Sequence, residues 1–430
     1  MIEVGIGIAQ TDITPAESVW LNGYGNREQK SEGVYQALRA GAIYLRGEAD
    51  EAMILTADHI GYGPSYASEA KLNISQATGL LPRQIILTAT HTHCAPFFSP
   101  WIMPGEIEVG YAAFLHRRLV EVAVAAKGRC VRGDVSFSRG TSTFGVNRRL
   151  PDGQGGILFA PCPDGPVDRD LDTLWFHDRQ GQPLGSLTVY GCHPTSLGGY
   201  MIGGDYPGFL CRQLESEKGA PAFFATGCAG DIRPWFNPGE SGFARPTLDE
   251  LEAASNVMAS EVLQSQSQAR PVDSAALRAD TAFHLLPYTE LPKREAVEQE
   301  AEETTDRRRR DWARQVILPL LDSGDLPCAC PQEIQVLQLD GDLRLVFMGG
   351  EILTEIGLHI KTSLEPATTV TVGYANGLIG YVPGKKTYAL GGYEVASSYH
   401  LFLRPAPFTE EAEDLVVGKA VDLAGVLSQK

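Results

Sequence analysis

Two histidines separated by a single residue offer the clearest chemistry in this chain. An apolar run at 85–87 passes through small residues to His91 and His93, and Pro96 closes the segment. This order of β-branched and apolar residues predicts a buried strand over 85–93. Because side chains alternate between the faces of a strand, both imidazoles are expected on one face. Neutral imidazole is a common zinc ligand, so the pair can begin a metal site; two polar strand-end residues bonded locally are the alternative.

Ligand-capable side chains follow other predicted strands as well. They are His193 after 184–190, Asp231 and Arg233 after 222–226, and Glu351 after the hairpin at 336–347. Enzymes with α/β folds collect their active-site groups at strand ends from distant parts of the chain. Two or three imidazoles with one carboxylate form a zinc-type ligand set that leaves a position for water. The sequence therefore favours a metal site built from these strand ends.

The residues between these candidates predict a mixed α/β fold, a β-sheet sandwich with flanking helices. Further strands are expected at 40–45, 52–57, 134–138 and 368–372, and helices at 65–79, 106–127, 208–217, 247–264, 352–364 and 410–428. Long loops are expected at 150–170 and 376–394. A helix or a helical pair is expected over 289–322, with the arginines 307–310 on a solvated face. Neither a repeat nor a linker divides the sequence, so a single domain over 1–430 is predicted.

The composition is that of an ordinary globular protein and limits the partners. Apolar residues make up 43% and charged residues 21% of the chain, and the formal net charge is −17. This balance argues against nucleic acid and anionic membrane, because both repel an acidic protein. The expected partner is a small-molecule substrate, and a local basic pocket can still bind an anionic one. No apolar run is long enough to span a membrane.

The cysteines and the first residues favour the cytoplasm. Eight cysteines are scattered along the chain, and only Cys328 and Cys330 lie close together. Scattered cysteines in a long chain are typical of a reduced protein. Residues 1–8 lead directly into a predicted first strand, without the basic start and cleavage site of a secretory signal. A cytoplasmic location is therefore expected.

Several short motifs occur in one order along nearly the whole chain. They are Ala-Thr-His-Thr-His-Cys-Ala-Pro at 89–96, Val-Asn-Arg-Arg at 146–149, Cys-His-Pro-Thr-Ser at 192–196, Gly-Asp-Tyr-Pro-Gly at 204–208, Ala-Gly-Asp-Ile-Arg-Pro at 229–234, Gly-Gly-Glu at 349–351, and Gly-Tyr-Val-Pro through Tyr-Glu-Val-Ala-Ser at 380–397. Each motif is weak alone, but their combination and order are specific. Together they resemble the catalytic domain of the neutral/alkaline ceramidase family.

The resemblance implies a catalytic zinc ion (Zn2+) and assigns the residues around it. The implied ligands are His91, His193, Glu351 and Tyr381, and the residues implied to face the substrate are His93, Arg148 and Tyr393. Tyr393 follows Tyr381 by twelve positions, as in the family. The strand-end argument favours the two histidines and the glutamate independently. It does not find Tyr381, which lies in a predicted loop.

Two departures from the family pattern bear on the substrate. Arg233 stands where the family motif Gly-Asp-Val-Ser-Pro has a serine that is important for amide cleavage. An arginine cannot act as a hydroxyl nucleophile, but its planar, permanently charged group suits carboxylate or phosphate. The family also carries an immunoglobulin-like C-terminal domain, whereas this sequence ends soon after the tyrosine motif. The substrate is therefore expected to differ from ceramide and to be anionic, with Arg148 and Arg233 holding its charged part.

The expected activity is that of a zinc-dependent hydrolase that cleaves an amide or ester bond with metal-activated water. His93 or Tyr393 would stabilise the oxyanion or protonate the leaving group. Asp231 would orient a ligand histidine or an arginine. One alternative is a carbohydrate-active enzyme, a hydrolase or lyase for a uronic-acid glycan, with Arg233 on the carboxylate. The other is a non-catalytic binding protein that has kept the pocket.

Overall fold

A computed structural model describes residues 4–429 and has two β-sheets packed face to face. The larger sheet contains β1 (Val4–Asp12), β3 (Arg39–Arg46), β4 (Glu51–Ala57), β5 (Ile85–Ala89), β6 (Val131–Thr141), β9 (Asp170–Asp178), β10 (Pro183–Tyr190), β12 (Ala222–Thr226) and β14 (Arg270–Val272). Its strand order is β12-β10-β9-β6-β1-β3-β4-β5, with β14 beside β6. The smaller sheet has the order β15-β16-β17-β19 and contains β15 (Arg278–Pro287), β16 (Ala329–Gln338), β17 (Leu343–Met348) and β19 (Thr368–Val372). Residues 1–3 of the predicted first strand lie outside the described residues.

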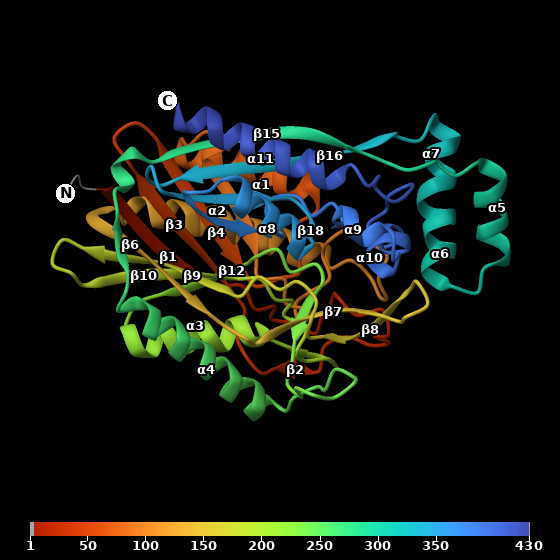
Figure 1. The fold of residues 1–430 in the computed structure, drawn as a ribbon, viewed down its shortest axis with the longest axis horizontal. Coiled ribbons are helices and arrows are strands. Elements are labelled where there is room, and N and C mark those ends of the chain that lie inside the picture. Colours follow the sequence, from red (N-terminus) through yellow and green to blue (C-terminus); the bar gives the residue numbers. More distant parts are fainter. Residues whose placement is uncertain (1–3, 430) are drawn as a thin grey trace.

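Helices cover the outer faces of both sheets (Figure 1). Those on the larger sheet are α1 (Pro64–Thr78), α2 (Val109–Gly128), α3 (Asp205–Lys218) and α4 (Leu248–Gln266), and those on the smaller sheet are α8 (Thr354–Ser363) and α11 (Ala412–Ser428). A helical extension of α5 (Arg294–Glu303), α6 (Arg307–Trp312) and α7 (Leu318–Ser323) projects from one end. The predicted sandwich with flanking helices is confirmed. No helix within residues 4–429 is long and apolar enough to cross a membrane.

Alternating side chains along the strands explain why the layers stack. In β3, Ile43 and Leu45 join the core between the two sheets, whereas Ala42 and Tyr44 join the core under α1 and α2. Because both faces of the strand are buried, nearly every residue in it is apolar. This is the pattern expected of a strand at the centre of a four-layer structure.

The structure corrects several predicted elements. The strand predicted over 85–93 ends at Ala89, and the helix predicted from 106 begins at Val109. The predicted loop at 150–170 contains β8 (Ile157–Cys162), which pairs with β7 (Gly145–Pro151). Glycine, proline and aspartate residues around this strand predicted a loop. Antiparallel pairing with β7 outweighs that local preference. Three pairs of short strands are also present: β13 (Ile232–Pro234) beside β7, β2 (Gly33–Val34) beside β11 (Met201–Ile202), and β18 (Glu351–Ile352) beside β20 (Tyr381–Val382). The predicted loop 376–394 contains β20, the short helix α9 (Lys385–Tyr388) and the start of α10 (Tyr393–Ala396).

The carboxyl ends of strands from both sheets meet at one place. The Thr226 hydroxyl at the end of β12 donates to the Thr90 carbonyl after β5, with a 2.7 Å separation. These strands stand at opposite ends of the strand order. The segment after β19 ties them together, because the Gly373 amide donates to Thr226 O at 3.0 Å and the Asn376 amide donates to Leu87 O at 2.7 Å. Loops leaving the two sheets are therefore held close to one another.

Candidate metal centre

His91 and His93 lie in the turn that follows β5. His91 has a φ of 64°, so the chain has left the extended conformation before it reaches either histidine. The two Nε2 atoms are nevertheless 3.3 Å apart. The sequence predicted their proximity, but the strand alternation given as its reason is wrong. A left-handed turn produces it.

His193 and Glu351 approach the same place from two other segments. The His193 amide donates to Ile232 O at 3.1 Å, which fixes the loop after β10. The Nε2 atom of His193 lies 3.0 Å from Glu351 Oε2, and His91 Nε2 lies 3.4 Å from the same oxygen. Glu351 pairs with Tyr381 in the parallel register of β18 and β20, and the Tyr381 hydroxyl is 3.4 Å from His193 Nε2. The four ligands implied by the resemblance are therefore neighbours in space.

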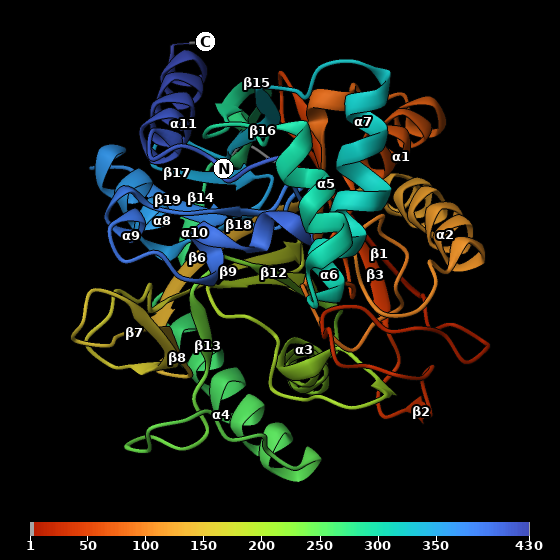
Figure 2. The same cartoon turned by 90° about the vertical axis from the view of Figure 1, so that its right-hand side faces the viewer.

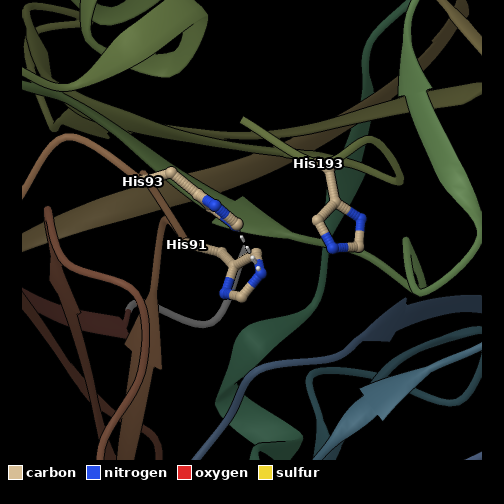
Figure 3. A group of neighbouring side chains, drawn as sticks. All are labelled: His91, His93 and His193. Atoms are coloured by element: carbon tan, nitrogen blue, oxygen red, sulfur yellow. Dashed lines mark hydrogen bonds between the residues drawn. The ribbon is translucent and has the colours of Figure 1, made fainter. Parts of the chain in front are cut away.

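Backbone carbonyls orient the three imidazoles. The Nδ1 atom of His93 contacts Gly23 O at 3.1 Å, and those of His91 and His193 contact Ile60 O and Ala229 O. A carbonyl oxygen only accepts, so each Nδ1 carries the proton and donates it. On a neutral ring this leaves the Nε2 lone pair free, as in histidines that bind metals. Figure 3 shows the three rings turned toward a common space.

The charge state of the buried groups favours a cation. Burial lowers the pKa of His193 to about 4 and the pKa of His93 well below its ordinary value, so both rings are neutral near pH 7. Burial would raise the pKa of the Glu351 carboxyl, but its contacts with His91 and His193 hold it well below the usual range. The neutral ring of His193 thus lies 3.0 Å from an ionised carboxylate. Zinc–nitrogen bonds of about 2.0–2.1 Å place tetrahedral ligand atoms roughly 3.3 Å apart, so these residues fit a zinc ion.

His93 lies as near to the centre as the implied ligands. Ligand atoms of His91, His93 and His193 all fall within 4.8 Å of one another. The geometry is compatible with a three-histidine set as well as with the set that includes Glu351 and Tyr381. The assignment of His93 to the substrate therefore depends on the resemblance.

Arg148 reaches the centre through the Tyr381 phenol. Its Nη2 donates to the Tyr381 hydroxyl at 3.2 Å, while its Nε donates to Glu394 Oε1 at 2.9 Å. Tyr393 also lies here, with its ring 5.5 Å from that of Tyr381. The sequence analysis did not single out Glu394, although it follows Tyr393 within a quoted motif. Its carboxylate also binds Arg149, so Glu394 balances two buried cations.

The role expected for Asp231 is wrong. Its carboxylate accepts from the Thr354 amide at 2.9 Å and from Asn147 Nδ2 at 2.8 Å, and not from a histidine or an arginine side chain. Only its backbone carbonyl meets an arginine, through the Arg148 amide at 2.8 Å. Asp231 therefore joins the start of α8 to β7. A carboxylate is well suited to the free amides at a helix N-terminus, which the sequence alone did not place beside it.

Arg233 carries a charge without an acidic partner among the described residues. Its Nε and Nη2 atoms donate to the hydroxyl and the carbonyl of Thr195, both at 3.1 Å. Its guanidinium carbon lies 5.3 Å from the ring centre of Phe159 and 4.8 Å from that of Phe243. Phe159 is itself exposed. The group is thus a partly buried cation on an aromatic surface.

Two further residues contact the centre and had no distinctive signal in the sequence. Gly23 has a φ of +97°, and a Cβ atom there would lie 2.3 Å from His93 Nδ1. Tyr374 is buried with its ring centre 4.1 Å from that of His91, and its hydroxyl has no hydrogen-bond partner within residues 4–429. Both pack against histidines that are distant in the chain, so only the folded structure identifies them.

Comparison with known proteins relates this architecture to the ceramidases. No family model matches the chain. It is 26% identical over 247 residues to the neutral ceramidase of Mycobacterium tuberculosis, which covers 52% of this chain and 37% of that protein. It is 23% identical over 274 residues to neutral ceramidase B of Dictyostelium discoideum. This alignment covers 54% of this chain and 35% of that protein. The alignments therefore span little more than a third of these curated relatives.

Solved structures extend the similarity to the whole chain. The crystal structure of the neutral ceramidase from Pseudomonas aeruginosa superposes with a TM-score of 0.77 and 20% identity, over 100% of this chain and 75% of that one. A ceramidase complexed with C2 superposes with a TM-score of 0.78 and 20% identity, over 100% of this chain and 76% of that one. The fold and the histidine centre thus define an α/β domain with a candidate metal site. More narrowly, the chain has the fold of a neutral ceramidase-like catalytic domain, as its motifs predicted.

Proposed function

We propose that this chain is a zinc-dependent hydrolase that cleaves an amide or ester bond of a small anionic molecule. The observation that carries the proposal is the convergence of His91, His193 and Glu351, with both Nε2 atoms within 3.4 Å of one carboxylate oxygen. The similar proteins are ceramidases, which hydrolyse an amide, and this supports the reaction class. We also propose that residues 1–430 form one domain. The eight cysteines are free thiols, which supports the expected cytoplasmic location.

The proposed zinc ligands are His91, His193, Glu351 and Tyr381. When bound at such a site, zinc acidifies a water molecule toward neutral pH and polarises a carbonyl group. His93 holds its proton on Nδ1 against Gly23 O, so its Nε2 can accept a proton and return it to the leaving group.

Tyr393 has a different proposed task. Burial raises the pKa of its phenol to about 12, so the hydroxyl stays protonated at neutral pH. It can therefore donate a hydrogen bond to a developing oxyanion. Arg148 keeps its proposed role beside the substrate, and its bond to the Tyr381 hydroxyl at 3.2 Å also positions that ligand.

Arg233 supports an anionic substrate. Its two donated hydrogen bonds end on Thr195, and no carboxylate within the described part of the chain neutralises it. A guanidinium of this kind binds carboxylate or phosphate strongly because the hydrogen bonds are charge-assisted. An N-acyl compound with a carboxylate near the scissile bond matches this arrangement.

The proposal is tested on matched N-acyl substrates that differ only in a carboxylate. Removal of zinc by a chelator should abolish turnover, and added zinc should restore it. Arg233→Ser should raise KM for the anionic substrate by about 10–100-fold and leave the neutral amide within about threefold. If the zinc-loaded protein is inert on amides and esters, the proposal fails.

A uronic-acid glycan is the second candidate, favoured by the aromatic surface beside Arg233. Phe159 and Phe243 lie 5.7 Å apart, and both flank the guanidinium group. An exposed ring, Phe159, and a half-buried one, Phe243, beside a cation suit a sugar that carries a carboxylate. Uronic-acid glycosides in the same substrate panel separate the two reactions, because only one bond type should be cleaved.

A further inference from the structure

A cavity of about 260 Å³ lies between the loops beside the centre and the start of α6. Its lining residues are Gly25, Ile102, Met103, Pro104, Asp306, Arg307 and Arg308. Figure 2 shows α6 at the end of the molecule that faces the viewer. Three chain segments far apart in sequence therefore form this cavity, one of them from the helical extension.

Two residues of the cavity wall, Gly25 and Arg308, are linked to the surroundings of the metal centre. Gly25 lies two residues from Gly23, whose carbonyl accepts from His93 Nδ1 at 3.1 Å. A Cβ atom on Gly25 would lie 3.0 Å from Arg308 Nη2, so this guanidinium reaches the same loop. Arg308 is also close enough to Tyr393 to lower the pKa of its phenol, against the larger effect of burial. The cavity wall thus includes a residue of the loop that orients His93 and a charge that acts on Tyr393.

The arginine run 307–310 is unevenly paired. Arg307 forms an ion pair with Asp311 at 3.4 Å, and Arg309 pairs with Glu300. Arg308 has no acidic partner among residues 4–429 and is half-buried, so the prediction of a solvated helix face does not describe it. Arg310 also has no acidic partner within the described residues, but it does not line the cavity.

Asp306 is the one acidic side chain in the cavity wall. Its carboxylate caps α6 by accepting from the amides of Arg308 and Arg309, at 2.8 and 3.3 Å. The lining therefore holds two guanidinium groups against one carboxylate that is already bonded. Ile102, Met103 and Pro104 provide the apolar part of the cavity wall.

We propose that this cavity is a substrate subsite in which Arg308 binds a carboxylate or phosphate group. The apolar wall covers the short hydrocarbon part that adjoins the anion. The identification of the bound anion as the substrate rests on the proposed hydrolase function. The binding of an anion by Arg308 does not depend on that function. Arg308 is a specificity-determining residue, distinct from Arg233, which is held by Thr195.

Calorimetric titration of the full chain tests the subsite, with and without zinc. The probes are hexanoate, hexyl phosphate and, as a neutral control, hexanol. Arg308→Ala should weaken the binding of at least one anion by about 10-fold or more, and Arg308→Lys by less. The matched control is Arg310→Ala, which removes an arginine two positions along α6 that does not line the cavity. It should change the Kd by less than about twofold.

The two anions distinguish the possible headgroups, because the better-bound one identifies the substrate class. Absence of anion binding by the wild type, or equal losses in the Arg308→Ala and Arg310→Ala variants, would overturn the subsite. Binding without any hydrolysis would contradict the proposed function and leave the subsite in place. If Arg308→Ala changes neither the rate of hydrolysis nor the Kd of the anions, the subsite is overturned and the proposed function stays in place.

Discussion

Two buried polar regions lie side by side in this protein and differ in how their groups are satisfied. In the Glu394 cluster (Arg148, Arg149 and Glu394), the carboxylate accepts from both guanidinium groups, and each charge has a partner. In the metal centre, the free Nε2 atoms of His91 and His193 face the Glu351 carboxylate. Burial alone therefore does not distinguish a site from its support. Acceptor atoms that converge from several segments beside the Tyr381 hydroxyl do.

The Glu394 cluster should be the more sensitive region for folding. Glu394→Ala leaves two arginines buried without their carboxylate, and we expect the free energy of unfolding to fall by about 3–5 kcal/mol. Denaturant unfolding measures this change. The control is Glu252→Ala, which removes an exposed pair with Arg212 and should cost less than about 1 kcal/mol. Equal losses in both variants would erase the distinction between the cluster and an ordinary surface ion pair.

Gly23→Ala probes the metal centre without touching a proposed ligand. The added Cβ would lie 2.3 Å from His93 Nδ1 at a φ of +97°. Gly79→Ala is the matched control, because Gly79 has a φ of +77° and open space around it. Both variants should lose about 1–2 kcal/mol of stability from the left-handed backbone. Only Gly23→Ala should also lower kcat, by about 10-fold or more, because it displaces His93. A Gly23→Ala enzyme as active as Gly79→Ala would separate His93 from the reaction.

His59 offers the smallest and most specific test, through pH. Its Nδ1 accepts from the Gly61 amide at 2.9 Å, its Nε2 has no hydrogen-bond partner in the described part of the chain, and burial lowers its pKa to about 3. The folded protein thus keeps His59 neutral, while the unfolded chain takes up a proton below about pH 6.5. Acidification therefore stabilises the unfolded state, and the wild type should lose about 1.4 kcal/mol more than His59→Asn between pH 7.5 and 5.5. Parallel stability curves for the two proteins would contradict the neutral, buried imidazole; bound zinc should be the same in both.

The sequence predicts the layers of the fold and part of the centre, each for a physical reason. His193 and Glu351 follow strands whose apolar pattern is local, so their position at strand ends is readable. Tyr381 is found only through the resemblance, because its place depends on the parallel pairing of β18 with β20. Local patterns cannot supply such pairings between distant segments.

Charged residues show the same limit more sharply. Asp231 carries the expected charge, but its partners, Thr354 and Asn147, come from segments that are distant in the chain. Glu394 and Arg308 each stand among other charged or polar residues, and only the fold decides which charge is neutralised and which remains free. Motif order therefore locates the site, while the choice of partners within it requires the structure.

The zinc content of a His91→Ala/His193→Ala double variant tests the central claim most directly. The protein is incubated with zinc, freed of unbound metal and analysed by mass spectrometry, with His59→Asn as a control for the loss of a buried histidine. The wild type and the control should each retain about one ion per chain, and the folded double variant less than about a tenth of that. A double variant that is folded and fully loaded with zinc would contradict the metal centre described above.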